Sequence, residues 1–207
     1  MEPFGLPHVA AAILGYLLGS IPFGLVLTKM AGLGDIRAIG SGNIGATNVL
    51  RTGRKDLALA TLLLDGGKGA IAVLIARLVG EDLTVIAGAA AILGHLFPVW
   101  LKFKGGKGVA TTLGTLIAAN WMVGIGACLV WVATALIFRY SSLAALMAVL
   151  SAPFLALGLG TMPQAYLAAF AAILVWIRHK DNIRRLLSGE EPKIGKKKDA
   201  AAPPPQA

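Results

Sequence analysis

The chain has 207 residues, of which 57% are hydrophobic and 14% are charged, and its formal net charge is +9. A typical soluble domain has about 25% charged residues. This composition excludes a disordered chain, a coiled coil and an ordinary water-soluble domain, and it predicts that lipid surrounds most of the protein.

Seven apolar segments follow one another along the chain, and about 20 residues are needed to cross about 30 Å of hydrocarbon. They are Phe4–Thr28, Leu57–Val79, Leu83–Leu101, Val109–Ala119, Trp121–Phe138, Ser142–Leu159 and Pro163–Ile177. No basic residue precedes the first segment, so we predict a retained span and not a secretory signal. The apolar run 109–138 is long for one crossing, and we predict a turn at Asn120; one long tilted helix, giving six spans, is the alternative.

The positions of the basic residues test the number of spans. With the N-terminus outside, seven spans place 17 of the 19 lysines and arginines on the cytoplasmic side, as the positive-inside rule requires. Six spans would separate the basic tail from other basic loops. The sequence therefore predicts an all-α integral membrane protein with seven transmembrane helices and a cytoplasmic C-terminus. The positive charge then needs no nucleic-acid partner.

Residues 1–192 are predicted to form one membrane domain, and the basic Ala/Pro-rich tail 193–207 is predicted to be disordered. The single cysteine, Cys128, excludes an intrachain disulfide and a cysteine-based zinc cluster. Few histidines and acidic residues remain to bind metal ions, so we expect neither a metal ion nor a cofactor.

The first predicted cytoplasmic loop combines glycines, small polar side chains and one arginine. Glycines allow close backbone approach, and a guanidinium binds phosphate through two parallel hydrogen bonds. A flexible polar loop that caps two helices is the alternative. The candidate site residues of this loop are Ser41, Gly42, Asn43, Thr47, Asn48 and Arg51.

The second predicted cytoplasmic loop runs from a glycine-rich turn directly into an apolar helix. The free N–H groups of a helix N-terminus bind anions, and the candidates here are Gly105, Gly106, Lys107 and Gly108. A Walker A loop is excluded because Gly108 stands where a serine or threonine would follow the lysine. A basic loop at the membrane edge is the alternative.

A third polar segment follows the last span. His179, Asn182 and Arg185 are spaced to share one helical face, and His179 is either a general base or an interfacial histidine. Ser142, after Arg139 in a short link, is either a site residue or a helix cap. Asp65 and Lys68 lie inside a span, where they either pair with each other or bind substrate.

Four runs of the sequence resemble one known family, the bacterial acyl-phosphate-dependent glycerol-3-phosphate acyltransferases (PlsY). They are the run 19–24 (Gly-Ser-Ile-Pro-Phe-Gly) and the loop motifs within 40–48, 94–111 and 178–190. The resemblance implies a seven-span enzyme of the bacterial inner membrane with its active site facing the cytoplasm. It also implies transfer of a fatty acyl group from acyl phosphate to the sn-1 hydroxyl of glycerol 3-phosphate. The products would be lysophosphatidic acid and phosphate, in the first step of phospholipid synthesis.

The resemblance also suggests residue roles and partners. It implies a polar active-site set of Ser41, Arg51, Lys107, Ser142, His179 and Asn182, with Gly105–Gly108 binding phosphate; Glu190 receives no assigned role. The expected partners are the two substrates, membrane lipid and an enzyme that supplies acyl phosphate.

From chemistry, Arg51 and Lys107 would hold phosphate and stabilise developing charge. His179 and Asn182 would position and deprotonate the hydroxyl, or a substrate phosphate would be the base. A phosphoester transporter is the competing class, although transporter sites usually lie at the midplane.

Overall fold

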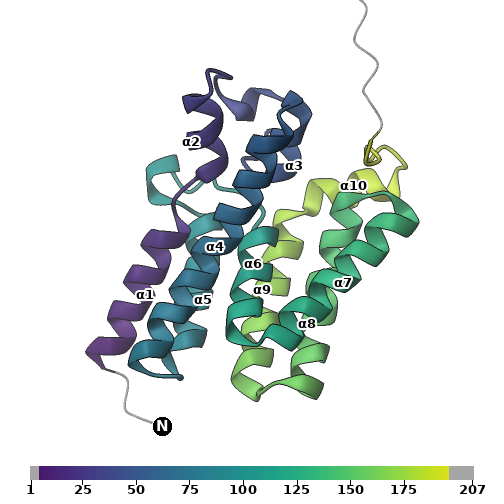
Figure 1. Ribbon diagram of the computed structural model, residues 1–207. Coiled ribbons are helices and arrows are strands. Elements are labelled where there is room, and N and C mark those ends of the chain that lie inside the picture. The colour runs from purple at the N-terminus through teal and green to yellow at the C-terminus, as the bar shows by residue number, and fades with distance from the viewer. Residues whose placement is uncertain (1–4, 196–207) are drawn as a thin grey trace, which may run out of the picture.

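The computed structural model describes residues 5–195, and these residues form helices and connecting loops without a β-strand. The long helices lie side by side along a common direction (Figure 1). The α-helices are α1 Leu6–Gly19, α2 Phe23–Met30, α3 Ala46–Val49, α4 Lys55–Val79, α5 Leu83–Leu96, α6 Val109–Ala119, α7 Trp121–Phe138, α8 Ser141–Leu159, α9 Met162–Arg178 and α10 Lys180–Leu187. Three short 3-10 turns cover Ile36–Ala38, Leu50–Thr52 and Val99–Leu101.

Five of the helical segments are long and apolar enough to cross a membrane, judged by length and composition. They are Leu6–Met30, Lys55–Val79, Leu83–Leu101, Trp121–Phe138 and Ser141–Leu159. Two further apolar helices, α6 and α9, are shorter, with 11 and 17 residues. The all-helical membrane architecture predicted from the sequence is confirmed.

The predicted turn at Asn120 is also confirmed, since α6 ends at Ala119 and α7 begins at Trp121. The Asn120 side chain accepts hydrogen bonds from the backbone N–H groups of Met122 and Val123, at 3.1 and 3.4 Å. An asparagine at this position satisfies amides that the first turn of a helix leaves unpaired. The alternative of a single tilted helix over 109–138 is therefore wrong.

Two predicted segments are not continuous helices. The first is broken at Ser20–Pro22, between α1 and α2, and the third ends at Leu96, two residues before Pro98. Proline has no N–H to donate to the helix, and its ring disfavours helical backbone in the residue before it. Both breaks lie toward the same end of the bundle as the long loops (Figure 1).

Small residues set the spacing between the helices. A Cβ atom on Gly15 would lie 2.5 Å from the carbonyl oxygen of Ala87, and one on Gly19 would lie 2.0 Å from that of Ala91. The backbones of α1 and α5 therefore touch, as is typical of helix pairs in membranes. Leucine, isoleucine and phenylalanine side chains are instead exposed on the outside of the bundle, for example on α4 and α7.

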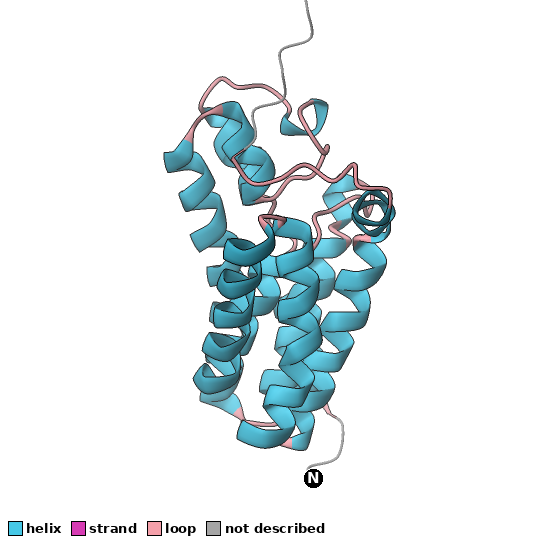
Figure 2. Cartoon of the chain, turned by 90° about the vertical axis from the view of Figure 1, so that its right-hand side faces the viewer, coloured by secondary structure: helices cyan, strands magenta, loops and turns pink. Residues whose placement is uncertain are grey.

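The long loops gather at one end of the bundle, which we call the loop end (Figure 2). The loop between α2 and α4, the loop between α5 and α6, and α10 all lie there, whereas the opposite end has short turns (Figures 1 and 2). The predicted tail lies outside the described residues except for 193–195. Within these, the Ile194 N–H donates to the Arg139 carbonyl oxygen at 2.7 Å.

Candidate active site

Polar segments that are distant in the sequence meet at the loop end. Lys107 donates to the side-chain oxygen of Asn182, which joins the second loop to α10. The hydroxyl groups of Thr47 and Ser141 lie 3.4 Å apart and join the first loop to the start of α8. All three predicted motifs and the Arg139–Ser142 link thus reach one region.

Asn48 organises the first loop from within. It is buried, and its amide nitrogen donates to the carbonyl oxygens of Ile36 and Ile39 at 3.0 and 2.9 Å. Its side-chain oxygen accepts from the Ser41 N–H at 3.1 Å and from Arg51 Nη1 at 3.2 Å. The Asn48 side chain therefore forms its hydrogen bonds within the first loop, and it holds Ser41 and Arg51 next to each other.

Replacing Asn48 with alanine is expected to lower the free energy of unfolding by about 1–3 kcal/mol, because buried carbonyl groups lose their donors. Thermal unfolding of the detergent-purified protein measures this effect. Asn43→Ala is the matched control, since the half-buried Asn43 side chain makes no hydrogen bond to a described residue. Equal unfolding temperatures for the two variants would contradict the role of Asn48.

The second loop turns back onto the end of α5. The N–H groups of Gly105 and Gly106 donate to the carbonyl oxygens of Leu96 and His95, each at 3.1 Å. Arg178, at the end of α9, donates to the carbonyl oxygens of Gly105 and Gly106 at 2.9 and 3.2 Å. The predicted use of the Gly105 and Gly106 amides for phosphate therefore conflicts with hydrogen bonds that already occupy them.

The helix end that follows this turn retains free donors. Gly108 adopts a φ of +85°, a left-handed conformation that favours glycine, and directly precedes α6. The first helical bond of α6 joins Thr112 N–H to the Gly108 carbonyl at 2.8 Å. The three preceding N–H groups, those of Val109, Ala110 and Thr111, belong to the first turn of the helix and have no partner within it. The anion site predicted for this loop thus narrows to Lys107 and the start of α6.

A chain of hydrogen bonds links Lys107 to a buried glutamate. Asn182 accepts from Lys107 and donates to Glu191 Oε1 at 2.7 Å, and Arg185 Nε donates to Glu191 Oε2 at 2.7 Å. Burial would raise the pKa of the Glu191 carboxyl, but neighbouring Ser142, Asn182 and Arg185 hold it below its ordinary value. Glu191 is therefore the ionised carboxylate of this cluster.

The Lys107 ammonium group loses its proton more easily than that of an ordinary lysine. The pKa of its ammonium group is lowered to about 8, mainly by burial; Arg185 and Arg51 add to this lowering, while Glu191 and Asp181 oppose it. The effect of Arg51 places the first loop within electrostatic reach of the second. A region that gathers cations in this way is stabilised by a bound anion.

His179 lies buried at the junction of α9 and α10, outside the apolar helices. Its Nδ1 lies 2.7 Å from the carbonyl oxygen of Val175, which can only accept a hydrogen bond. Nδ1 therefore carries the proton, and Nε2 is an acceptor. Burial lowers the pKa of His179 to about 4, so its ring is neutral at physiological pH.

The structure distinguishes Glu190 from its neighbour Glu191, and it shows that Ser142 is not a helix cap. Glu191 is buried within the cluster, whereas Glu190, the acid noted in the third motif, is exposed. Gly189, with a φ of +75°, turns the chain back after α10 and brings Glu191 rather than Glu190 inward. Ser142 is the second residue of α8, is buried beside Glu191 and does not cap the helix.

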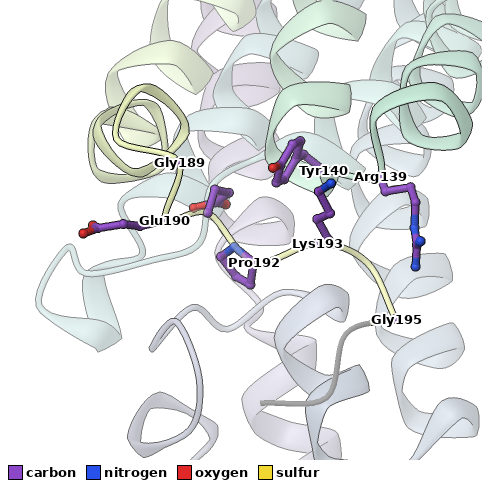
Figure 3. Close-up of a pocket in the computed structure, with 8 residues that line it drawn as sticks. Arg139, Tyr140, Gly189, Glu190, Pro192, Lys193 and Gly195 are labelled. Atoms are coloured by element: carbon purple, nitrogen blue, oxygen red, sulfur yellow. The ribbon is translucent and has the colours of Figure 1, made fainter. Parts of the chain in front are cut away.

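A pocket of about 520 Å³ adjoins this cluster (Figure 3). Arg139, Tyr140, Glu190, Glu191 and Lys193 are among the residues that line it. The Lys193 ammonium lies 5.6 Å from the centre of the Tyr140 ring, and the Glu190 side chain points away from both (Figure 3). Within residues 5–195, no group of three His, Cys, Asp or Glu side chains is arranged to bind a metal ion.

The fold is that of an integral membrane protein, and the cationic cluster at the ends of its helices is of the kind that binds phosphorylated molecules. Residues 9–189 match the family model of glycerol-3-phosphate acyltransferase, and the chain belongs to this family. The protein is therefore a membrane acyltransferase, which decides against the transporter alternative.

Individual relatives agree with this assignment. The glycerol-3-phosphate acyltransferase of Rhodospirillum rubrum is 63% identical over 199 residues, covering 92% of both chains. That of Caulobacter vibrioides (strain NA1000 / CB15N) is 61% identical over 199 residues, covering 94% of this chain and 91% of the relative. The crystal structure of PlsY, an integral membrane glycerol 3-phosphate acyltransferase, is similar in its glycerol 3-phosphate form, with a TM-score of 0.85, 41% identity and coverage of 91% of this chain and 96% of that chain. The lysophosphatidic acid form of the same enzyme gives a TM-score of 0.84 at 41% identity, covering 91% of this chain and 95% of that chain.

Proposed function

We propose that the protein transfers a fatty acyl group from acyl phosphate to the sn-1 hydroxyl of glycerol 3-phosphate, giving lysophosphatidic acid and phosphate. The observation that carries this proposal is the convergence of Arg51 and Lys107, two cations from different loops whose charges affect each other. Both substrates carry phosphate, so both need cationic partners. The solved PlsY forms with glycerol 3-phosphate and lysophosphatidic acid support the acceptor and the product.

The reaction joins the hydroxyl oxygen to the acyl carbon and breaks the bond between that carbon and the phosphate oxygen. Acyl phosphate is already activated, so a serine acyl-enzyme is unnecessary, and phosphate leaves with the electron pair of the broken bond. Arg51 and Lys107 would bind the phosphates and stabilise the charge that develops on the leaving group.

The hydroxyl proton has two possible acceptors, His179 Nε2 and a substrate phosphate. An alkyl phosphate has a second pKa of about 6, whereas the pKa of His179 is about 4. The phosphate is thus the stronger base, and we assign the proton to it. Because a hydroxyl has one proton, its hydrogen bond to His179 Nε2 would orient the oxygen as the substrate binds, and would be exchanged for one to the phosphate before proton transfer.

We further propose seven crossings of the bacterial inner membrane, with the N-terminus outside and the loop end facing the cytoplasm. The positive-inside rule supports this orientation, since the loop end carries the basic residues of the first two polar loops and of α10. A water-soluble substrate would reach the site from the cytoplasm, and an acyl chain would reach it from the lipid. An enzyme that produces acyl phosphate would supply the donor.

A donor-exchange assay tests the proposed reaction. Purified protein in lipid receives labelled glycerol 3-phosphate with palmitoyl phosphate, palmitoyl-CoA or palmitoyl acyl carrier protein, in the presence of excess EDTA. We expect labelled 1-acyl product from palmitoyl phosphate alone. Product from a thioester would overturn the donor assignment, and a product acylated at the sn-2 hydroxyl would overturn the regiochemistry.

A further inference from the structure

A buried polar network lies between α4 and α5, beneath the second loop. Asp65, Lys68 and His95 are each at most 4% exposed. The Lys68 ammonium donates to Asp65 Oδ1, to His95 Nδ1 and to the Ile21 carbonyl oxygen, each at 2.8 Å. All three of its protons are used, so this lysine has no proton left for a substrate.

The lysine fixes both the tautomer and the position of the His95 ring. An ammonium group only donates, so His95 Nδ1 must accept and the neutral ring carries its proton on Nε2. Asp65 holds Lys68 from the same helix, and the Ile21 carbonyl holds it from the break between α1 and α2. Helices α4 and α5 and the break between α1 and α2 therefore determine where this ring lies.

Gly106 rests directly on the far edge of the ring. A Cβ atom on Gly106 would lie 2.2 Å from His95 Nε2, and its three nearest neighbours would all be atoms of this ring. The Gly106 N–H also donates to the His95 carbonyl oxygen at 3.1 Å. His95 thus contacts the loop through its ring and its backbone, one residue before Lys107.

We propose that Asp65, Lys68 and His95 are positioning residues for Lys107. They fix the position of the Gly105–Gly106 turn against the end of α5, so that the Lys107 ammonium reaches Asn182 and the phosphate site. This inference rests on the proposed role of Lys107 as a phosphate-binding cation. It assigns a function to the charges inside α4, which make no contact with Arg51, Lys107 or Asn182.

The test is a double-mutant cycle between His95 and Lys107. In His95→Asn, the side-chain oxygen replaces Nδ1 as the acceptor for Lys68, but the ring edge under Gly106 is lost. We expect kcat to fall by about 10²-fold, which is typical when a catalytic group is displaced by about 1 Å. Because His95 acts through Lys107, the double variant His95→Asn/Lys107→Ala is expected to have the same kcat as Lys107→Ala.

Two outcomes would overturn the proposal. One is a wild-type kcat for His95→Asn. The other is a double variant in which the two single losses multiply, because independent roles are additive in free energy. All rates are measured with whichever acyl donor supports turnover by the wild type, so an error in the donor assignment leaves this test intact.

Gly106→Ala disturbs the same contact from the loop and retains all three side chains of the buried network, which covers the case that His95→Asn does not fold. We expect a similar fall in kcat and the same lack of further loss with Lys107→Ala. Gly67→Ala is the matched control, since a Cβ atom there meets no atom within 4 Å. Wild-type kcat in Gly106→Ala would also overturn the proposal.

Discussion

Replacing Lys107 with alanine is expected to lower kcat for acyl transfer by about 10²- to 10³-fold, the usual effect of removing one charge-stabilising donor. Lys107 is the lysine of the second loop that reaches α10, where it donates to Asn182. Its loss leaves the developing phosphate charge without that cation. Steady-state kinetics with labelled glycerol 3-phosphate measure the change in kcat and in KM.

Lys104→Ala is the matched control for this experiment. Lys104 belongs to the same basic loop, but its side chain is exposed. Removing it is expected to leave kcat near the wild-type value. Comparable losses in the two variants would mean that the loop acts through its total charge, and the specific role of Lys107 would be refuted.

The pH dependence of kcat/KM is a second test of the role of Lys107. Because the pKa of Lys107 is about 8, the free enzyme loses this charge as the pH rises through 8. The kcat/KM for glycerol 3-phosphate, which reports the free enzyme, is expected to decrease above that pH. A guanidinium stays charged, so the decrease should be absent in Lys107→Arg, and its persistence there would assign the titration to another group.

Arg51→Ala is expected to lower kcat/KM for glycerol 3-phosphate by about 10- to 100-fold, since hydrogen bonds to charged groups contribute about 1.5–3 kcal/mol. Asn48 accepts from Nη1 of the guanidinium, and Arg51 is exposed, so we expect its remaining N–H groups to bind phosphate. Arg51→Lys should recover only part of the loss, because an ammonium lacks the planar pair of donors. The same kinetic assay resolves the three proteins.

Arg54→Ala provides the comparison for Arg51. Arg54 is an exposed arginine three residues further on, and it pairs with exposed Asp56 at 2.6 Å. Exposed ion pairs contribute little, so this variant should match the wild type. Full recovery of activity by Arg51→Lys would show that charge alone is required at position 51.

Local chemistry explains which features were predictable from the sequence. The turn at Asn120 follows from an amide side chain that caps the helix directly after it. The breaks at Pro22 and Pro98 also have local causes, but the surrounding residues are apolar, so hydrophobicity alone does not reveal them. Ser142 could not be assigned to the site or to a cap, because burial depends on the segment that packs over it.

Glu190 and Glu191 show most clearly what could not be predicted from the sequence. The sequence places two identical acids side by side, and only the structure shows that Glu191 is buried against Asn182 and Arg185 while Glu190 is exposed. Similarly, the glycines at 105 and 106 suggested amides free for phosphate, but the end of α5 uses those amides. Glycine indicates close packing and anion binding equally, so the sequence does not distinguish the two roles.

The amino-acid sequence is sufficient to predict that lipid surrounds this protein, that it is helical, that its cations and glycines lie in three motifs, and which family those motifs resemble. These properties depend on composition, periodicity and residues near one another in the chain. The tertiary structure decided that Asn48 organises the first loop, that Glu191 completes the cluster, and that His95 and Lys68 lie beneath Gly106. Each of these depends on contacts between segments many residues apart, and their distances are set only when the helices pack.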